Sequence, residues 1–165
     1  SGGAIYFHNQ NNGQCVLYKV CGNECCSTYT SGHLYGQFAY IILYNVDTSK
    51  NYVNYSSIAR CVNDDSISYY LLRLNHGKIC CPSGNVSMNK CYTRTVYCLP
   101  VIDSNYVTCS FTYSSFADNN ATGCTHFFLW SLGAKYEIKS CNIIRNTQGN
   151  LDSEGTIYTK GNVMI

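Results

Sequence analysis

Apolar and polar residues alternate along the chain in short runs, and one run recurs at a regular interval. Small residues precede an apolar or aromatic pair at six places, whose marker positions are Ile5, Tyr40, Tyr69, Val96, Phe127 and Ile157. Successive markers lie 27 to 35 residues apart. Alternation at period two predicts strands, and the Gly, Asn and Ser residues between the runs predict turns. Because no segment carries a helical apolar period with caps, the sequence predicts an all-β chain.

A second strand phrase falls between the markers. It starts at Asn, Gln or Lys and continues with alternating apolar residues, often up to a Cys, in 14–21, 51–53, 85–91, 105–109, 135–141 and 162–165. A unit of about 30 residues with short strands cannot bury its own apolar face, whereas stacked units bury it in columns of inward side chains. We therefore expect residues 1–165 to form one segment of a right-handed parallel β-helix with about five to six coils, part of a longer repeat protein.

Two short motifs fall on this period. Gly2-Gly3-Ala4-Ile5 matches a GGA[I/L/V] phrase, and Phe116-Ala117-Asp118-Asn119 matches an FxxN phrase. Degraded copies of the first occur at 36–39 and 154–157. In these motifs and in the spacing of its repeats, the chain resembles the polymorphic membrane protein (Pmp) family of bacterial autotransporters and the Pmp-like surface proteins of some protists. The resemblance implies a β-helix at a cell surface.

The charge of the chain limits its function classes. Its net charge is +2, and its 11 Lys and Arg residues form no cluster. Nucleic-acid binding needs several cations on one face, so we expect no nucleic-acid partner. The longest apolar run, residues 38–44, is far shorter than the roughly 20 residues of a membrane span, so we expect no membrane segment in this piece.

Cysteines and sequons favour the secretory pathway. The chain has 12 Cys and three N-x-S/T sequons, at Asn54, Asn85 and Asn120, which are candidates for glycosylation. Disulfides persist and glycans are attached in that pathway, so we expect an extracellular or cell-surface protein.

Five cysteines follow the second strand phrase, namely Cys21, Cys61, Cys91, Cys109 and Cys141. We expect them to form a buried column of thiols, or disulfides between coils, near one corner. The adjacent pairs Cys25-Cys26 and Cys80-Cys81 are expected at turns with their side chains on opposite faces, and spacing does not determine their partners. Cys21 and Cys25 have a C-x3-C spacing, but no second pair completes a zinc site, so we expect no metal and no cofactor.

A carbohydrate-active enzyme, either a polysaccharide lyase or a glycoside hydrolase, is the alternative function. Such an enzyme would need carboxylates on adjacent coils as acid and base, and the candidates are Asn63-Asp64-Asp65, Asp103 and Gly32-His33. Their order differs from that of polygalacturonase-like enzymes, because Gly-His precedes the acidic pair and no Arg-x-Lys follows. Asp64-Asp65 is more typical of a solvated turn, or of a weak calcium site.

A cysteine-protease triad of Cys15, His33 and Asp47 is also disfavoured. Only 18 residues separate Cys15 from His33, which leaves no room for the helix-to-sheet architecture of those enzymes. We assign no catalytic residues.

The sequence therefore predicts a non-enzymatic structural or adhesion module. Its partners would be host or neighbouring surface proteins or glycans. Exposed tyrosines are the first candidates for contact, namely Tyr35, Tyr44, Tyr70, Tyr92 and Tyr113. End-to-end self-association through the strand edges at 2–5 and 162–165 is a third alternative.

Overall fold

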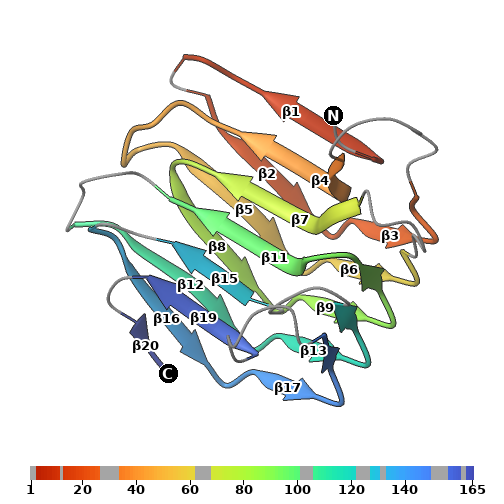
Figure 1. Ribbon diagram of the computed structural model, residues 1–165. Helices are drawn as coiled ribbons and strands as arrows, with labels where there is room; N and C mark the ends of the chain where they lie inside the picture. The colour runs from red at the N-terminus through yellow and green to blue at the C-terminus, as the bar shows by residue number, and fades with distance from the viewer. Residues whose placement is uncertain are drawn as a thin grey trace.

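The computed structural model describes residues 3–11, 13–26, 34–61, 68–100, 106–121, 127–130, 133–149, 156–160 and 163–165. These residues form strands and no helix, so none of the described segments is a helix that could cross a membrane. The strands stack along one axis, with β1 and β2 at the end nearest the N-terminus and β19 and β20 at the other (Figure 1).

Four sheets run along this axis. Sheet A consists of β1 (Ile5–His8), β4 (Leu34–Ile42), β7 (Ser68–Asn75), β11 (Arg94–Leu99), β15 (Phe127–Trp130) and β19 (Ile157–Lys160). Sheet B consists of β2 (Cys15–Tyr18), β5 (Lys50–Asn54), β8 (Lys78–Pro82), β12 (Thr108–Thr112), β16 (Lys135–Lys139) and β20 (Val163–Met164). Sheet C consists of β3 (Cys21–Asn23), β6 (Ser57–Ala59), β9 (Asn85–Ser87), β13 (Ser115–Ala117) and β17 (Asn142–Ile144). Sheet D consists of β10 (Lys90–Cys91), β14 (Asn120–Ala121) and β18 (Thr147–Gln148).

Strand neighbours in every sheet are parallel and come from successive repeats of the chain. Strand β5, for example, pairs with β2 on one side and with β8 on the other. The chain is therefore a parallel β-solenoid, which confirms the predicted all-β fold class. Its right-handed sense and its coil count stay predictions.

Two corners of the coil turn on single residues in the left-handed backbone region. The corner between sheets B and C, the B–C corner, uses Lys19, Tyr55, Ser83, Tyr113 and Ser140, with φ of 52 to 54°. The corner after sheet C, the C–D corner, uses Glu24, Arg60, Met88, Asp118 and Arg145, with φ of 51 to 57°. One left-handed residue bends an extended chain sharply, so each corner takes up little sequence.

The residues that immediately follow the C–D corner form a second repeated feature. They are Cys25, Cys61, Asn89, Asn119 and Asn146, which we call the ladder column. Within it, the Nδ2 atom of Asn89 donates to Oδ1 of Asn119 at 2.9 Å, and that of Asn119 donates to Oδ1 of Asn146 at 3.0 Å. Side chains of this column therefore contact each other from coil to coil.

The core lies between sheets A, B and C. Phe111 of sheet B, Phe116 of sheet C and Phe127 of sheet A meet there, with ring centroids 4.4 to 6.1 Å apart. Alternate residues of each strand supply this core, as in β5, where Asn51 and Val53 are buried between more exposed neighbours.

The register corrects two of the predicted markers. Ile5 is paired with Ala39, and Ala39 with Leu72, so Tyr40 and Tyr69 are not equivalent to Ile5. Tyr40 lies one position further, on the outer face, where its ring contacts that of Tyr6. Aromatic residues therefore occur on both faces of this sheet, and an aromatic side chain alone does not identify an inward position. Val96, Phe127 and Ile157 are in register as predicted.

One copy of the second strand phrase, at residues 85–91, lies in a different sheet from the other copies. Residues 85–87 form β9 of sheet C, whereas the sheet B strand of that repeat is β8. Both segments have the same alternation of buried and more exposed positions, so the pattern alone does not separate them.

Candidate functional site

The five cysteines of the predicted column lie in different places. Cys109 faces the core from sheet B, Cys91 is in sheet D, and Cys61 belongs to the ladder column. Cys21 is the first residue of β3, and Cys141 immediately precedes β17. The structure therefore does not bring these five together in one column, because the chain reaches them at different points of the coil.

The described cysteines are all free thiols in the structure. The pair Cys80-Cys81 lies inside strand β8 rather than at a turn. Its two side chains do face opposite sides, since Cys81 is buried and Cys80 is half-buried. Cys25 and Cys26 follow the C–D corner, where Cys26 is exposed and Cys25 is partly buried.

Three buried thiols gather in the core from sheets A and B, namely Cys81, Cys98 and Cys109. Burial raises the pKa of Cys109 to about 12 and also raises those of Cys81 and Cys98. Burial likewise raises the pKa of Cys15, the residue of the disfavoured protease triad. A thiol with a raised pKa is a poor nucleophile at neutral pH, so these groups act as small apolar side chains.

The three candidate glycosylation sites differ in accessibility. Asn85 is exposed on the outer side of sheet C. Asn54 has a buried Oδ1, and Ser56 of its sequon is only 3% exposed. Asn120 is half-buried in β14, and Thr122 of its sequon lies outside the described residues. In the folded chain Asn85 is therefore the most accessible of the three.

The five tyrosines predicted to contact partners also differ in their exposure to solvent. Tyr44 and Tyr113 are exposed, by 48% and 67%, but Tyr70 is buried at 9%. Tyr92 is half-buried, and the side chain of Tyr35 lies outside the described part of the chain. Tyr70 is buried because it packs on Tyr97, with ring centroids 4.9 Å apart, on the outer face of sheet A.

A ladder of aromatic rings and one cation covers the outer face of sheet A. Tyr6, Tyr40, Arg73 and Tyr97 occupy one column in successive strands. The guanidinium carbon of Arg73 lies 4.8 Å from the ring centre of Tyr40 and 5.2 Å from that of Tyr97. Cation–π contacts of this kind stabilise the stack. They also occupy the ring faces, so the stack mainly stiffens the sheet.

Exposed tyrosines gather instead at the B–C corner. Tyr18, Tyr55 and Tyr113 are 54 to 67% exposed, and we call them the tyrosine corner. Tyr18 and Tyr55 are in edge-to-face contact with centroids 5.7 Å apart, and the Lys19 ammonium lies 5.2 Å from the Tyr18 ring centre. Tyr18, Lys19 and Tyr55 together present aromatic surface and positive charge to solvent, and Tyr113 lies two coils further along the same corner.

Buried serines anchor the tyrosine corner. Ser56 Oγ accepts from Val20 N–H at 3.2 Å, and Ser114 Oγ accepts from Gly84 N–H at 2.9 Å. The Tyr55 and Tyr113 N–H groups donate to carbonyls of the next coil, at 2.9 and 3.0 Å. The repeated dipeptide Tyr-Ser thus places one side chain outward and one inward. It is the sequence signal by which this corner could have been found.

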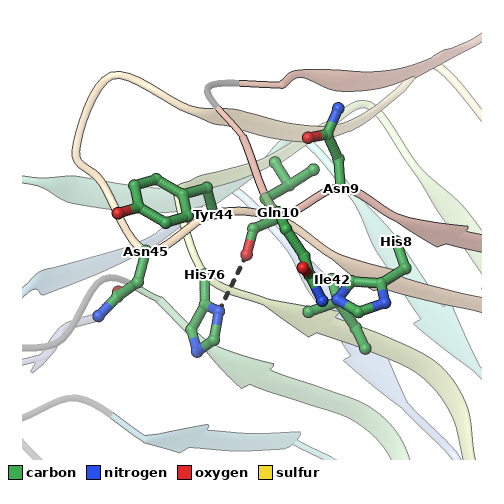
Figure 2. A pocket seen from close by; sticks show the side chains of 8 residues that line it. His8, Asn9, Gln10, Ile42, Tyr44, Asn45 and His76 are labelled. Carbon is green, nitrogen blue, oxygen red and sulfur yellow. Dashed lines mark hydrogen bonds between the residues drawn. The ribbon is translucent and has the colours of Figure 1, made fainter.

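A pocket of about 360 Å³ lies where β1, β4 and β7 end. It is lined by His8, Asn9, Gln10, Ile42, Leu43, Tyr44, Asn45 and His76. In the view of Figure 2, His76 lies between Tyr44 and Asn45 on one side and Gln10, Ile42 and His8 on the other. His76 Nδ1 lies 3.0 Å from the Leu43 carbonyl oxygen, which orients the imidazole ring. Amides, imidazoles and one phenol suit a small uncharged polar ligand.

The acidic candidates for catalysis cannot be placed in this pocket. Asn63, Asp64, Asp65, Asp103 and the Gly32-His33 pair lie outside the described residues. Among the residues that are described, Asp118 accepts two hydrogen bonds from Arg145 across adjacent coils, which lowers its pKa. No group of three or more His, Cys, Asp or Glu residues arranged to hold a metal occurs in that part of the chain.

A scan against protein-family models found no matching family, and searches of curated proteins and of solved structures found no significant match. Within the described part of the chain, the tyrosine corner and the pocket both offer groups that could bind a partner.

Proposed function

We propose that the chain is a non-enzymatic structural or adhesion module of the cell surface or extracellular space, wound as a right-handed β-helix. Its contact surface would be the tyrosine corner. The observation that carries this proposal is that Tyr55 and Tyr113, both bulky aromatic residues, occupy left-handed backbone positions and are 54% and 67% exposed.

A tyrosine in this position is a cost to the fold. Left-handed backbone is uncommon for bulky side chains, and Asn or Gly adopts it with less strain. Exposed aromatic surface adds nothing to the core. Residues that are locally unfavourable in a rigid framework are typical of functional positions, so a binding role accounts for both tyrosines.

The corner is also suited to binding because it is held in place before contact. The buried hydroxyls of Ser56 and Ser114 tie it to the neighbouring coils. Tyrosine loses little conformational entropy on contact and offers both an apolar ring and a hydroxyl, which makes it a frequent anchor in interfaces. Its partners would be surface proteins or glycans.

The test is binding of the purified protein to a panel of immobilised oligosaccharides and glycoproteins. We expect at least one specific interaction, and we expect the double variant Tyr55→Asn, Tyr113→Asn to weaken it about tenfold or more. The melting temperature of this variant should be equal to or above that of the wild type, because Asn relaxes the left-handed backbone. Ser83→Asn, at the same corner column, is the matched control that changes the backbone preference without removing an aromatic ring.

Two results would contradict the proposal. Binding that is unchanged in the double variant would remove the tyrosine corner from the contact surface. Release of reducing sugar from pectin or hyaluronan by the wild type would favour the carbohydrate-active enzyme instead.

A further inference from the structure

The ladder column changes its chemistry at the end nearest the N-terminus. Asn89, Asn119 and Asn146 occupy three successive coils, and Cys61 and Cys25 occupy the same position in the two coils before them. Cys25 and Cys61 are equivalent in the register. Asn23 of β3 is paired with Ala59 of β6, and each strand is followed by one left-handed residue, Glu24 or Arg60, and then by the cysteine. From this placement we infer that Cys25 and Cys61 form a disulfide between adjacent coils in an oxidising environment.

The asparagines show how side chains in this column are directed. Oδ1 of Asn119 accepts from the N–H of Asn89 at 3.1 Å, and Oδ1 of Asn89 accepts from the N–H of Cys61 at 2.9 Å. Each side chain thus points toward the preceding coil. The Cys61 side chain takes the equivalent place beside Cys25, whose backbone N–H lowers and whose thiol raises the pKa of Cys61.

The surroundings allow the two sulfurs to meet. Adjacent parallel strands are roughly 4.8 Å apart, which lies within the roughly 4.4–6.8 Å between Cα atoms that a disulfide spans. Cys61 is fully buried in the core, and Cys25 packs against that core from a partly exposed position. The two thiols are separate in the structure, so forming the bond requires their side chains to turn toward each other.

The oxidation needs an external disulfide such as oxidised glutathione. The more accessible Cys25 thiolate attacks it, forms a mixed disulfide and releases one molecule of glutathione. The Cys61 thiolate then attacks the Cys25 sulfur and releases the second glutathione, so that two electrons pass from the protein thiols to the oxidant. Burial raises the pKa of Cys61 to about 12, so this second step is slow and becomes faster as the pH rises.

Tryptic mapping separates this pair from other pairings. Trypsin cleaves after Lys19, Lys50, Arg60 and Arg73, so Cys61 is the single cysteine of peptide 61–73, whereas Cys21, Cys25 and Cys26 share peptide 20–50. The reduced protein is incubated with oxidised glutathione at mildly alkaline pH, free thiols are alkylated, and the digest is analysed by mass spectrometry. We expect peptides 20–50 and 61–73 to be linked. The oxidised protein should melt on the order of 5–10 °C higher than the reduced protein.

Single variants identify the partner of Cys61. The link should disappear in Cys25→Ser and persist in Cys21→Ser and in Cys26→Ser, with the folded state of each variant checked by circular dichroism. Persistence of the link in Cys25→Ser would overturn the inference. So would a wild type that carries glutathione on Cys25 and has no link to peptide 61–73. Neither result depends on what the tyrosine corner binds.

Discussion

Asn119 is the most fully connected residue of the ladder column. Its Nδ2 atom donates to the Val86 carbonyl at 2.9 Å and to Oδ1 of Asn146, and its Oδ1 accepts from both the N–H and the Nδ2 of Asn89. The side chain is 1% exposed, so water cannot replace these partners. A polar residue in the core is tolerated here because its polar atoms are satisfied.

Replacing Asn119 with Ala should therefore destabilise the fold strongly. The change leaves a buried carbonyl and a buried N–H without partners, at a cost of roughly 1–3 kcal/mol for each group. We expect the free energy of unfolding in urea to fall by about 2–4 kcal/mol. Asn142→Ala, on the exposed side of sheet C, is the control and should change it by less than about 0.5 kcal/mol. Equal effects of the two changes would show that the ladder column does not stabilise the coils.

At the scale of the elements, strand β13 links the three main sheets. Its central residue Phe116 is buried at 3% exposure and packs its ring against Phe127 of β15 and Phe111 of β12. Sheet C has strands of only three residues, so each strand contributes one inward side chain. The attachment of sheet C to the core therefore depends on one side chain from each strand.

We expect Phe116→Ala to lower the free energy of unfolding by about 3–5 kcal/mol, since it removes a buried ring and leaves a cavity. Hydrogen exchange should show the largest loss of protection in β13 and in its neighbours β9 and β17, which pair with it. Tyr106→Ala, which removes a ring that is 94% exposed, should leave both measurements unchanged. Loss of protection spread evenly over all sheets would contradict the local role of this strand.

For the whole molecule, the buried thiols make stability depend on pH. Cys81, Cys98 and Cys109 have raised pKa values in the folded chain, with Cys109 at about 12, whereas an unfolded thiol ionises near about 8.5. Above that pH the unfolded state loses protons that the folded state keeps. The stabilising contribution is therefore complete below about pH 8.5 and falls as the pH rises toward 12, by at most about 1.4 kcal/mol per thiol and pH unit.

Urea unfolding between pH 7.5 and 10.5, with the thiols kept reduced, measures this effect. The wild type should become less stable across the upper half of this range. A variant with Cys81, Cys98 and Cys109 all changed to Ala should start less stable but show a shallower decline. Cys21→Ala removes an exposed thiol and should keep the slope of the wild type. An unchanged slope in the triple variant would mean that these thiols do not govern the decline.

The fold class and most strands of sheets A and B follow from the sequence alone, whereas most strands of sheets C and D were not predicted. Period-two alternation and a repeat of about 30 residues require stacked parallel strands, because no single repeat can cover its own apolar face. That reasoning placed Val96, Phe127 and Ile157 in one column, as the register confirms. It misplaced Tyr40, because an aromatic side chain fits the outer ladder as well as the core.

Which residues meet across coils depends on the folded backbone. Loops of unequal length, such as 43–49 between β4 and β5 and 76–77 between β7 and β8, change the spacing from repeat to repeat, so a sequence interval does not identify the neighbour in the next coil. For this reason the five predicted cysteines separate, whereas Cys25 and Cys61, which no interval had paired, come together beside the asparagine ladder. The exposure of Tyr55 and Tyr113 depends on their own left-handed backbone at the B–C corner, for which the repeated Tyr-Ser dipeptide is the signal in the sequence.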